Sequence, residues 1–154
     1  MSMTEQQKAT KTVATLVVSN SLEELDKLRP FLDDVVDVCK VSKETVDSLN
    51  LALEEALSNV MLYAYPKGHI GQIRLDAIMS EDKNILAFVL SDCGVAFDPT
   101  LQPPADITLS ADERQIGGLG IFLIKNIMDE VTYRRIDGCN ELTMQKKIRL
   151  RNPF

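Results

Sequence analysis

The sequence is poor in the side chains that most metal and nucleophile chemistry uses. Its 154 residues contain no tryptophan, one histidine (His69) and 5% aromatic residues. A single histidine argues against a site with several histidine ligands, and its place after a Lys-Gly pair indicates a surface or structural role. The three cysteines, Cys39, Cys93 and Cys139, are odd in number and match no Cys-x-x-Cys metal pattern. We therefore expect reduced thiols in a reducing compartment.

Long apolar runs and an excess of positive charge are also absent. No run approaches the ~18 apolar residues of a membrane-spanning helix, and residues 1–11 are polar, lack a signal-peptide core and are expected to be a flexible terminus. The chain has 17 Lys and Arg against 23 Asp and Glu, a net charge of -6, which argues against binding nucleic acid through its phosphates. The negative net charge does not exclude a small phosphate ligand, because such a ligand needs only a few local hydrogen-bond donors. From the short apolar runs and the polar first residues we expect a soluble, cytoplasmic protein that does not contact a membrane. From the negative net charge we expect no direct contact with nucleic acid.

The length fits one domain, and hydrophobic periodicity predicts its elements. Ser21 and Glu24 form a capping-box pattern, and Ser42 is a suitable N-cap for the next helix. In chain order we expect a strand over 13–18, a helix over 22–39 that Pro30 kinks or splits, a helix over 43–64, strands over 73–77 and 85–90, a helix over 121–128, and strands over 131–136 and 141–150.

Helices and strands in this order do not strictly alternate. The pattern favours an α+β fold: a two-layer α/β sandwich with a mixed, mostly antiparallel sheet covered by helices on one face. The segment over 98–115 holds three prolines and many polar residues. A loop of that length in a compact domain is usually functional or disordered.

Two pairs of residues could carry chemistry. Glu55 and Asn59 are four residues apart on one helix, so their side chains share a face among small and apolar neighbours. The amide oxygen could bind a cation such as Mg²⁺, and the carboxylate could accept a proton; the alternative is a solvated helix face. Asp92, followed by Gly94 after an apolar strand, could accept a hydrogen bond from an amino group such as that of adenine; the alternative is an ordinary turn.

A third group is glycine-rich. Gly117-Gly118-Leu119-Gly120 runs into a helix, where clustered backbone N–H groups and the helix dipole favour phosphate. No Gly-Lys-Ser/Thr follows, and the spacing is not that of a dinucleotide-binding fingerprint. Alone, this segment could equally be a flexible hinge.

Taken in order, the three groups resemble the N, G1 and G2 boxes of the GHKL ATPase superfamily, which includes gyrase, Hsp90, MutL and histidine kinases. The short chain is most similar to the anti-sigma factor serine/threonine kinases of bacterial partner-switching systems. The segments that carry this closer resemblance are 54–59, Phe97-Asp98-Pro99, 117–124 and 128–131. It spans roughly residues 12–149 and implies a single Bergerat-fold, histidine kinase-like ATPase domain over 1–154.

The resemblance implies a role for each matching residue. Asn59 would bind the Mg²⁺ that bridges the ATP phosphates, and Glu55 would act as general base or orient the acceptor hydroxyl. Asp92 would bind the adenine amino group, and Gly94 would allow close approach of the ring. The phosphates would lie against the glycine-rich helix start, and residues 98–116 would form a mobile lid. The implied phosphate contacts are Arg114, Gly117, Gly118, Leu119, Gly120 and Ile121.

The chain departs from the family pattern at three positions. Ala96 stands where the G1 box commonly has its second glycine, and Tyr63 where the N-box helix often carries histidine. Relatives often offer a threonine near the adenine aspartate, and Thr143 is a candidate for it.

The resemblance also implies a function. The chain would bind ATP and Mg²⁺, hold a sigma factor inactive and phosphorylate a serine on a STAS-type anti-anti-sigma protein, as a homodimer. One alternative is a nucleotide-binding partner-switching module without kinase activity. Another, a catalytic fragment of a two-component sensor, is disfavoured because the sequence shows no dimerisation helix with a phosphoacceptor histidine.

Overall fold

A computed structural model describes residues 10–101 and 118–148. Helices and strands follow the expected order, and several are longer than the sequence pattern suggests. The elements are β1 (Thr10–Ser19), the 3-10 helix η1 (Leu22–Lys27), α2 (Leu28–Cys39), α3 (Lys43–Tyr63), β2 (Gln72–Ser80), β3 (Ile85–Asp92), the 3-10 helix η2 (Pro99–Leu101), α4 (Gly118–Ile127), β4 (Glu130–Ile136) and β5 (Cys139–Lys147).

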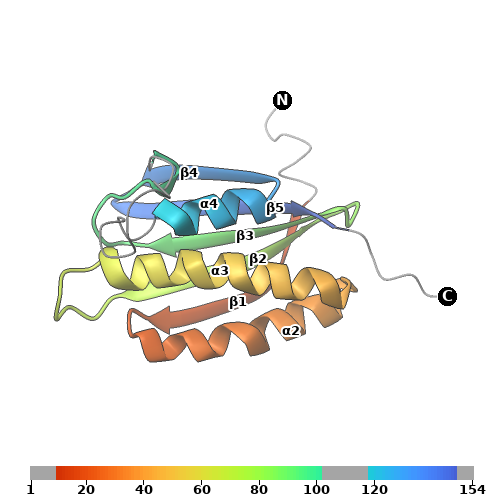
Figure 1. Cartoon of the computed structure of the whole chain (residues 1–154), viewed down its shortest axis with the longest axis horizontal. Helices are drawn as coiled ribbons and strands as arrows, with labels where there is room; N and C mark the ends of the chain where they lie inside the picture. Colours follow the sequence, from red (N-terminus) through yellow and green to blue (C-terminus); the bar gives the residue numbers. More distant parts are fainter. Residues whose placement is uncertain (1–9, 102–117, 149–154) are drawn as a thin grey trace.

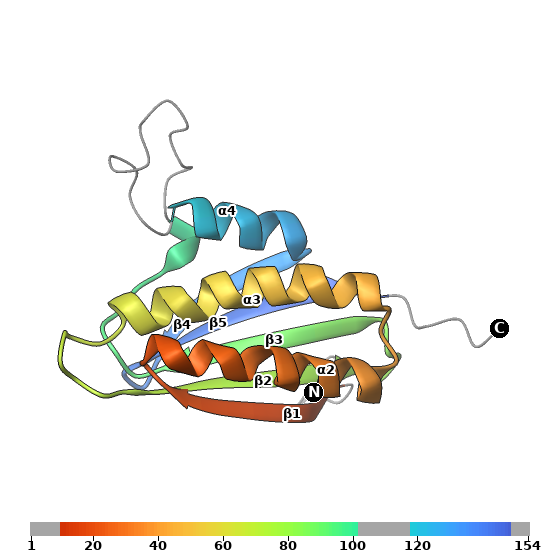
Figure 2. The same cartoon turned by 60° about the horizontal axis from the view of Figure 1, so that its bottom comes forward.

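The strands form one antiparallel sheet in the order β1-β2-β3-β5-β4. Helices α2, α3 and α4 all cover the same face of this sheet (Figures 1 and 2). The predicted α+β sandwich is therefore confirmed. No helix in the described ranges is long and apolar enough to cross a membrane.

Alternation along the strands separates the two faces of the sheet. In β3, Leu86, Phe88, Leu90 and Asp92 are buried under the helices, whereas the residues between them are half-buried on the other face. The helices meet this surface with apolar stripes, since Leu32, Val35, Leu49 and Leu53 are almost fully buried. Burying a leucine or valine side chain stabilises a fold by roughly 1.5–3 kcal/mol, so this face holds the core.

The start of the first predicted helix differs from expectation. A 3-10 segment, η1, precedes α2, and Ser21 makes no side-chain cap hydrogen bond. The Glu24 carboxylate instead accepts from the backbone N–H of Ser19, so the capping-box prediction is wrong. Pro30 lies in the first turn of α2, where its missing N–H has no intrahelical partner to lose. The break thus comes before Pro30, and the helix continues through it.

Other local predictions also need correction. Ser42 stands at the N-cap of α3 but makes no side-chain cap hydrogen bond; its hydroxyl pairs with that of Thr45. Thr10 and Lys11 belong to β1, so the expected flexible terminus is too long by these two residues, and residues 1–9 lie outside the described part.

The cysteines contradict the expectation of reduced thiols. Cys93 and Cys139 form a disulfide across the ends of β3 and β5, with their Cα atoms 3.9 Å apart. Their separation of 46 residues hides this proximity in the sequence, because it arises only when the two strands pair. Cys39 is a free, buried thiol, and burial raises its pKa.

We predict that reducing this disulfide destabilises the fold. A cross-link that closes a loop of this length reduces the conformational entropy of the unfolded chain. Its loss should therefore lower the free energy of unfolding by about 2–4 kcal/mol. Denaturant titrations with and without a phosphine reductant measure the difference. The free energy of unfolding of a Cys93→Ser, Cys139→Ser double variant should equal that of the reduced protein. Adding the reductant should not change it. Three titratable thiols in denatured protein that has met no reductant would contradict the cross-link.

Candidate functional site

Helix α3 carries the first pair of candidate residues toward the interior. Asn59 is 93% buried, at 7% exposure, Glu55 is half-buried one turn earlier, and Glu54 is exposed. No described residue forms a hydrogen bond with the Asn59 side chain, which lines a cavity between the helices and the sheet. Among the described residues no fully buried side-chain nitrogen or oxygen atom lacks a hydrogen-bond partner. An amide that lines a cavity and forms no hydrogen bond with the described part of the fold is suited to a polar ligand.

Asp92 ends β3 on the helix side of the sheet and is 4% exposed. Its Oδ1 accepts two hydrogen bonds, from the backbone N–H of Gly94 at 2.9 Å and from the Asn140 amide at 3.0 Å. Within the described ranges its Oδ2 has no hydrogen-bond donor. The carboxylate thus has one oxygen fixed by the protein and one available to a ligand.

The turn after Asp92 is docked on the end of α3. The backbone N–H of Val95 donates to the carbonyl of Ala64 at 2.7 Å. A Cβ on Gly94 would lie 2.0 Å from that same carbonyl oxygen, a separation no real Cβ contact has. Only glycine allows the turn to approach the helix this closely.

The start of α4 lies against the Glu55–Asn59 face of α3. A Cβ on Gly120 would lie 3.0 Å from a Glu55 carboxylate oxygen and 3.3 Å from the Asn59 amide nitrogen. The structure thus brings the glycine-rich helix start beside the helix that carries the carboxylate and the amide. Backbone N–H groups at such a helix start are free to bind phosphate.

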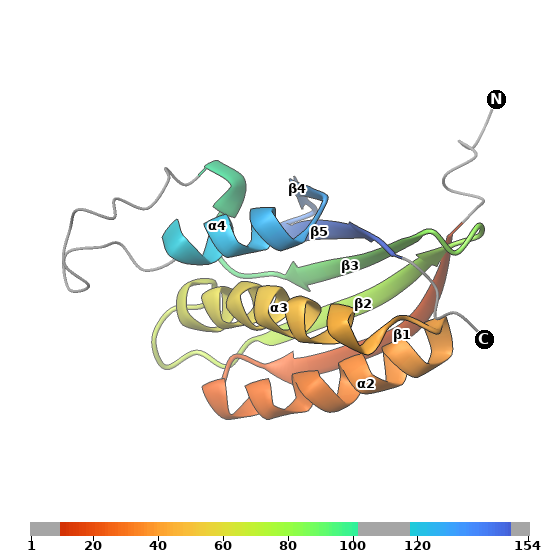
Figure 3. The ribbon, with the colours of Figure 1, turned by 45° about the vertical axis from the view of Figure 1, so that its right-hand side comes forward.

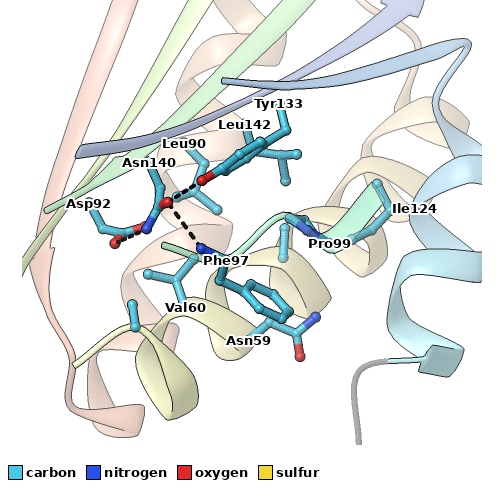
Figure 4. A pocket seen from close by; sticks show the side chains of 12 residues that line it. Asn59, Val60, Leu90, Asp92, Phe97, Pro99, Ile124, Tyr133, Asn140 and Leu142 are labelled. Atoms are coloured by element: carbon cyan, nitrogen blue, oxygen red, sulfur yellow. Dashed lines mark hydrogen bonds between the residues drawn. The ribbon is translucent and has the colours of Figure 1, made fainter. Parts of the chain in front are cut away.

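The cavity between these elements is small. Its volume is about 30 Å³, against roughly 300–1,000 Å³ for typical ligand pockets. Phe97 and Asn59 both line it (Figure 4). A nucleotide base would require the half-buried Phe97 ring and its neighbours to move. The lining residues are Ala56, Asn59, Val60, Ala64, Leu90, Asp92, Phe97, Pro99, Ile124, Tyr133, Asn140 and Leu142.

Some predicted site residues with described side chains do not line this cavity: Glu55, Gly94, Gly120 and Ile121. Ile121 is buried against the core, and Gly118 and Leu119 belong to the first turn of α4. Arg114 and Gly117 lie outside the described residues, as does the predicted lid beyond Leu101.

Thr143 is not the polar partner of Asp92. It pairs with Val89 and so lies on the face of the sheet away from the helices. On the helix side, the residue of β5 opposite Asp92 is Asn140. Sequence reasoning missed Asn140 because its partner stands 48 residues earlier and only strand pairing brings the two together.

No group of three or more His, Cys, Asp or Glu residues in the described ranges could hold a metal ion by itself. Asn59 could supply one oxygen ligand. Mg²⁺ commonly keeps several waters and takes its other ligands from substrate phosphates. The residues present therefore fit a metal that arrives with a nucleotide.

Comparisons with known proteins agree with this arrangement. A family model described as a histidine kinase-like ATPase domain matches residues 18–146. The chain belongs to this family. The family expected from the three motifs is thus confirmed, and histidine kinase-like ATPase domains are ATP-binding modules.

Several curated relatives are named as kinases. Serine/threonine-protein kinase BtrW of Bordetella bronchiseptica is 35% identical over 99 residues, covering 63% of this chain and 67% of the relative. Serine-protein kinase RsbW of Staphylococcus aureus is 31% identical over 137 residues, covering 86% of this chain and 84% of the relative. RsbW of Listeria monocytogenes is 35% identical over 94 residues, and the match spans only 59% of its length.

A solved structure supports the fold of the ATPase domain. The crystal structure of the RsbU and RsbW domains of a Mycobacterium tuberculosis protein aligns with a TM-score of 0.61 at 12% identity. The alignment covers 88% of this chain and 33% of that one. At this identity the likeness shows the fold alone.

We predict that Gly94→Ala damages the site. The added methyl group must push the turn away from Ala64, which should cost about 1–3 kcal/mol of stability and lower ATP affinity at least about tenfold by moving Asp92. Thermal melting and calorimetric titration measure the two effects.

Gly138→Ala is the matched control. Its Cβ would meet no atom within 4 Å, although its φ of +77° is unfavourable for alanine. A cost of roughly 1 kcal/mol in stability with unchanged ATP affinity is expected. Equal ATP binding by the Gly94 and Gly138 variants would contradict the docking argument.

Proposed function

We propose that this ATPase domain binds ATP with Mg²⁺ across the gap between α3 and the end of β3. The observation that carries the proposal is the Asn59 side chain, which is 7% exposed and forms no hydrogen bond with any described residue. It faces a cavity that also contains the half-paired Asp92 carboxylate. These two polar side chains come from different elements, α3 and the end of β3, so they can meet different ends of one ligand, its phosphates and its base.

In this proposal Asp92 Oδ2 accepts the adenine amino group, and Gly94 allows the base to approach the turn. Asn59 supplies an oxygen ligand to Mg²⁺, and the start of α4 from Gly118 to Ile121 holds the phosphates. Arg114 and Gly117 are proposed as further phosphate contacts. When bound, Mg²⁺ would neutralise charge on the phosphates.

We further propose that the domain is a serine/threonine protein kinase. Glu55 lies one turn before Asn59 and against Gly120, so its carboxylate can accept the proton of a serine hydroxyl or orient it beside the phosphates. Phosphoryl transfer needs mainly positioning and charge neutralisation, which these residues offer. The kinase names of the relatives support this reading.

The proposed target is a serine of a STAS-type anti-anti-sigma protein. The proposed second partner is a sigma factor, held inactive by a cytoplasmic homodimer of this chain. A nucleotide-binding module that switches partners without transferring phosphate is the alternative. The position of Glu55 favours the kinase, because a binding module has no need of a carboxylate at the phosphate end.

Asn59→Ala should separate binding from stability. The variant loses the proposed Mg²⁺ ligand, so ATP affinity in the presence of Mg²⁺ should fall at least about tenfold. Stability should stay equal or rise, because the substitution removes no hydrogen bond to a described residue and alanine favours a helix. Calorimetric titration and melting curves test this, with Asn50→Ala on the same helix as control. Unchanged Mg-ATP affinity in a folded Asn59→Ala protein would remove the basis of the proposal.

Glu55→Gln should bind ATP normally and transfer no phosphate. Transfer of the labelled γ-phosphate of ATP to a STAS protein measures the second property. Glu54→Gln is the matched control, because Glu54 is the exposed neighbour on the same helix and should retain wild-type transfer. A wild-type protein that binds ATP but labels no STAS protein would favour the partner-switching module.

A further inference from the structure

Asn140 occupies an unusual position for a polar side chain. It is 5% exposed, and among the described residues the only other buried polar or charged ones are Asn59 and Asp92. It begins the inward face of β5 and pairs in register with Asp92 of β3. All three buried polar residues line the same cavity.

The Asn140 amide uses its whole hydrogen-bonding capacity. Its Nδ2 donates to Asp92 Oδ1 at 3.0 Å and to the carbonyl of Val95 at 2.8 Å. Its Oδ1 accepts from the backbone N–H of Phe97 at 3.3 Å and from the Tyr133 hydroxyl at 2.5 Å. A primary amide has two donor hydrogens and two acceptor lone pairs, so these four bonds fix its orientation. Figure 4 shows Asn140 at the centre of this network.

The network determines which oxygen of Asp92 meets a ligand. Because Asn140 and the backbone N–H of Gly94 both donate to Oδ1, the carboxylate plane is held and Oδ2 is the oxygen available to the cavity. Asn140 also ties the turn after Asp92 at two further points, Val95 and Phe97. The carboxylate and the turn that borders it are therefore held by one side chain from another strand.

We propose that Asn140 is a positioning residue that holds Asp92 Oδ2 as a single fixed acceptor and thereby sets the preference for adenine over guanine. This inference rests on the proposed nucleotide site. Adenine presents a donor amino group to a fixed acceptor. Guanine presents a carbonyl oxygen at the corresponding position, which would leave two acceptors facing each other without a proton. If Asp92 could rotate freely, this discrimination would weaken.

The test compares three ligands, each with Mg²⁺: ATP, GTP and inorganic tripolyphosphate, which has no base. Asn140→Asp keeps the shape of the side chain and replaces the donor that faces Asp92 by an oxygen. We expect its ATP affinity to fall at least about tenfold and its ATP-to-GTP ratio to move toward one, with tripolyphosphate binding unchanged. Thr143→Val, on the outer face of the same strand, should leave all three affinities unchanged.

Asn140→Asp introduces a carboxylate at a buried position and could fail to fold. Tyr133→Phe provides a second test that avoids this. It removes only the hydroxyl that donates to Asn140 and should lower the ATP-to-GTP ratio by a smaller factor, about two- to fivefold. An unchanged ratio in both variants, or an equal loss for all three ligands, would overturn the positioning role. A wild-type protein that binds no ATP would instead overturn the proposed function together with this inference.

Discussion

The five-stranded sheet buries one face only, and this constraint fixes the side on which each candidate residue lies. Alternation along β3 and β5 sends Leu90 and Leu142 to the helices. The same alternation sends Asp92 and Asn140 to that side, two residues further toward the end of the ladder. A shift of one residue in strand register would turn both polar side chains outward. The apolar core thus sets the position of the site before any ligand is bound.

The polar groups buried at this end of the sheet differ in how they are satisfied. Asn140 has partners for both its donors and both its acceptors, and Asp92 has partners for one oxygen. Asn59 has none among the described residues. The two residues of the sheet therefore have protein partners, whereas the residue on α3 has none in the described ranges. The fully bonded group belongs to the scaffold, and the under-bonded groups are those left for a ligand. Figure 3 shows α3 and α4 side by side over this region.

Much of the architecture follows from local sequence patterns. The periodicity of α3, the alternation of β2 and the continuous apolar run of β3 predict these elements. The closeness of Gly120 to Glu55 is not predicted, because it depends on how α4 packs on α3. Local patterns do not predict hydrogen bonds between residues that only the tertiary fold brings together. Ser21 has a capping sequence, yet the neighbouring strand offers Glu24 a different partner. Asn140 and the Cys93–Cys139 link depend on the pairing of β3 with β5, which no nearby residue signals. The proposed roles of Arg114 and Gly117 stay predictions, since both residues lie outside the described part.

The docking of the Gly94 turn on Ala64 has an evolutionary consequence. Asn59 and Ala64 are connected by one continuous helical segment. The helix therefore fixes the distance and the rotation between the proposed metal ligand, Asn59, and the residue on which the Gly94 turn is docked, Ala64. Inserting or deleting one residue between them would rotate one of these residues by about 100° relative to the other. The turn between β2 and β3, at the far end of the sheet, carries no such restriction. Length variation among descendants of this chain is therefore tolerated in that turn and excluded from the last turns of α3.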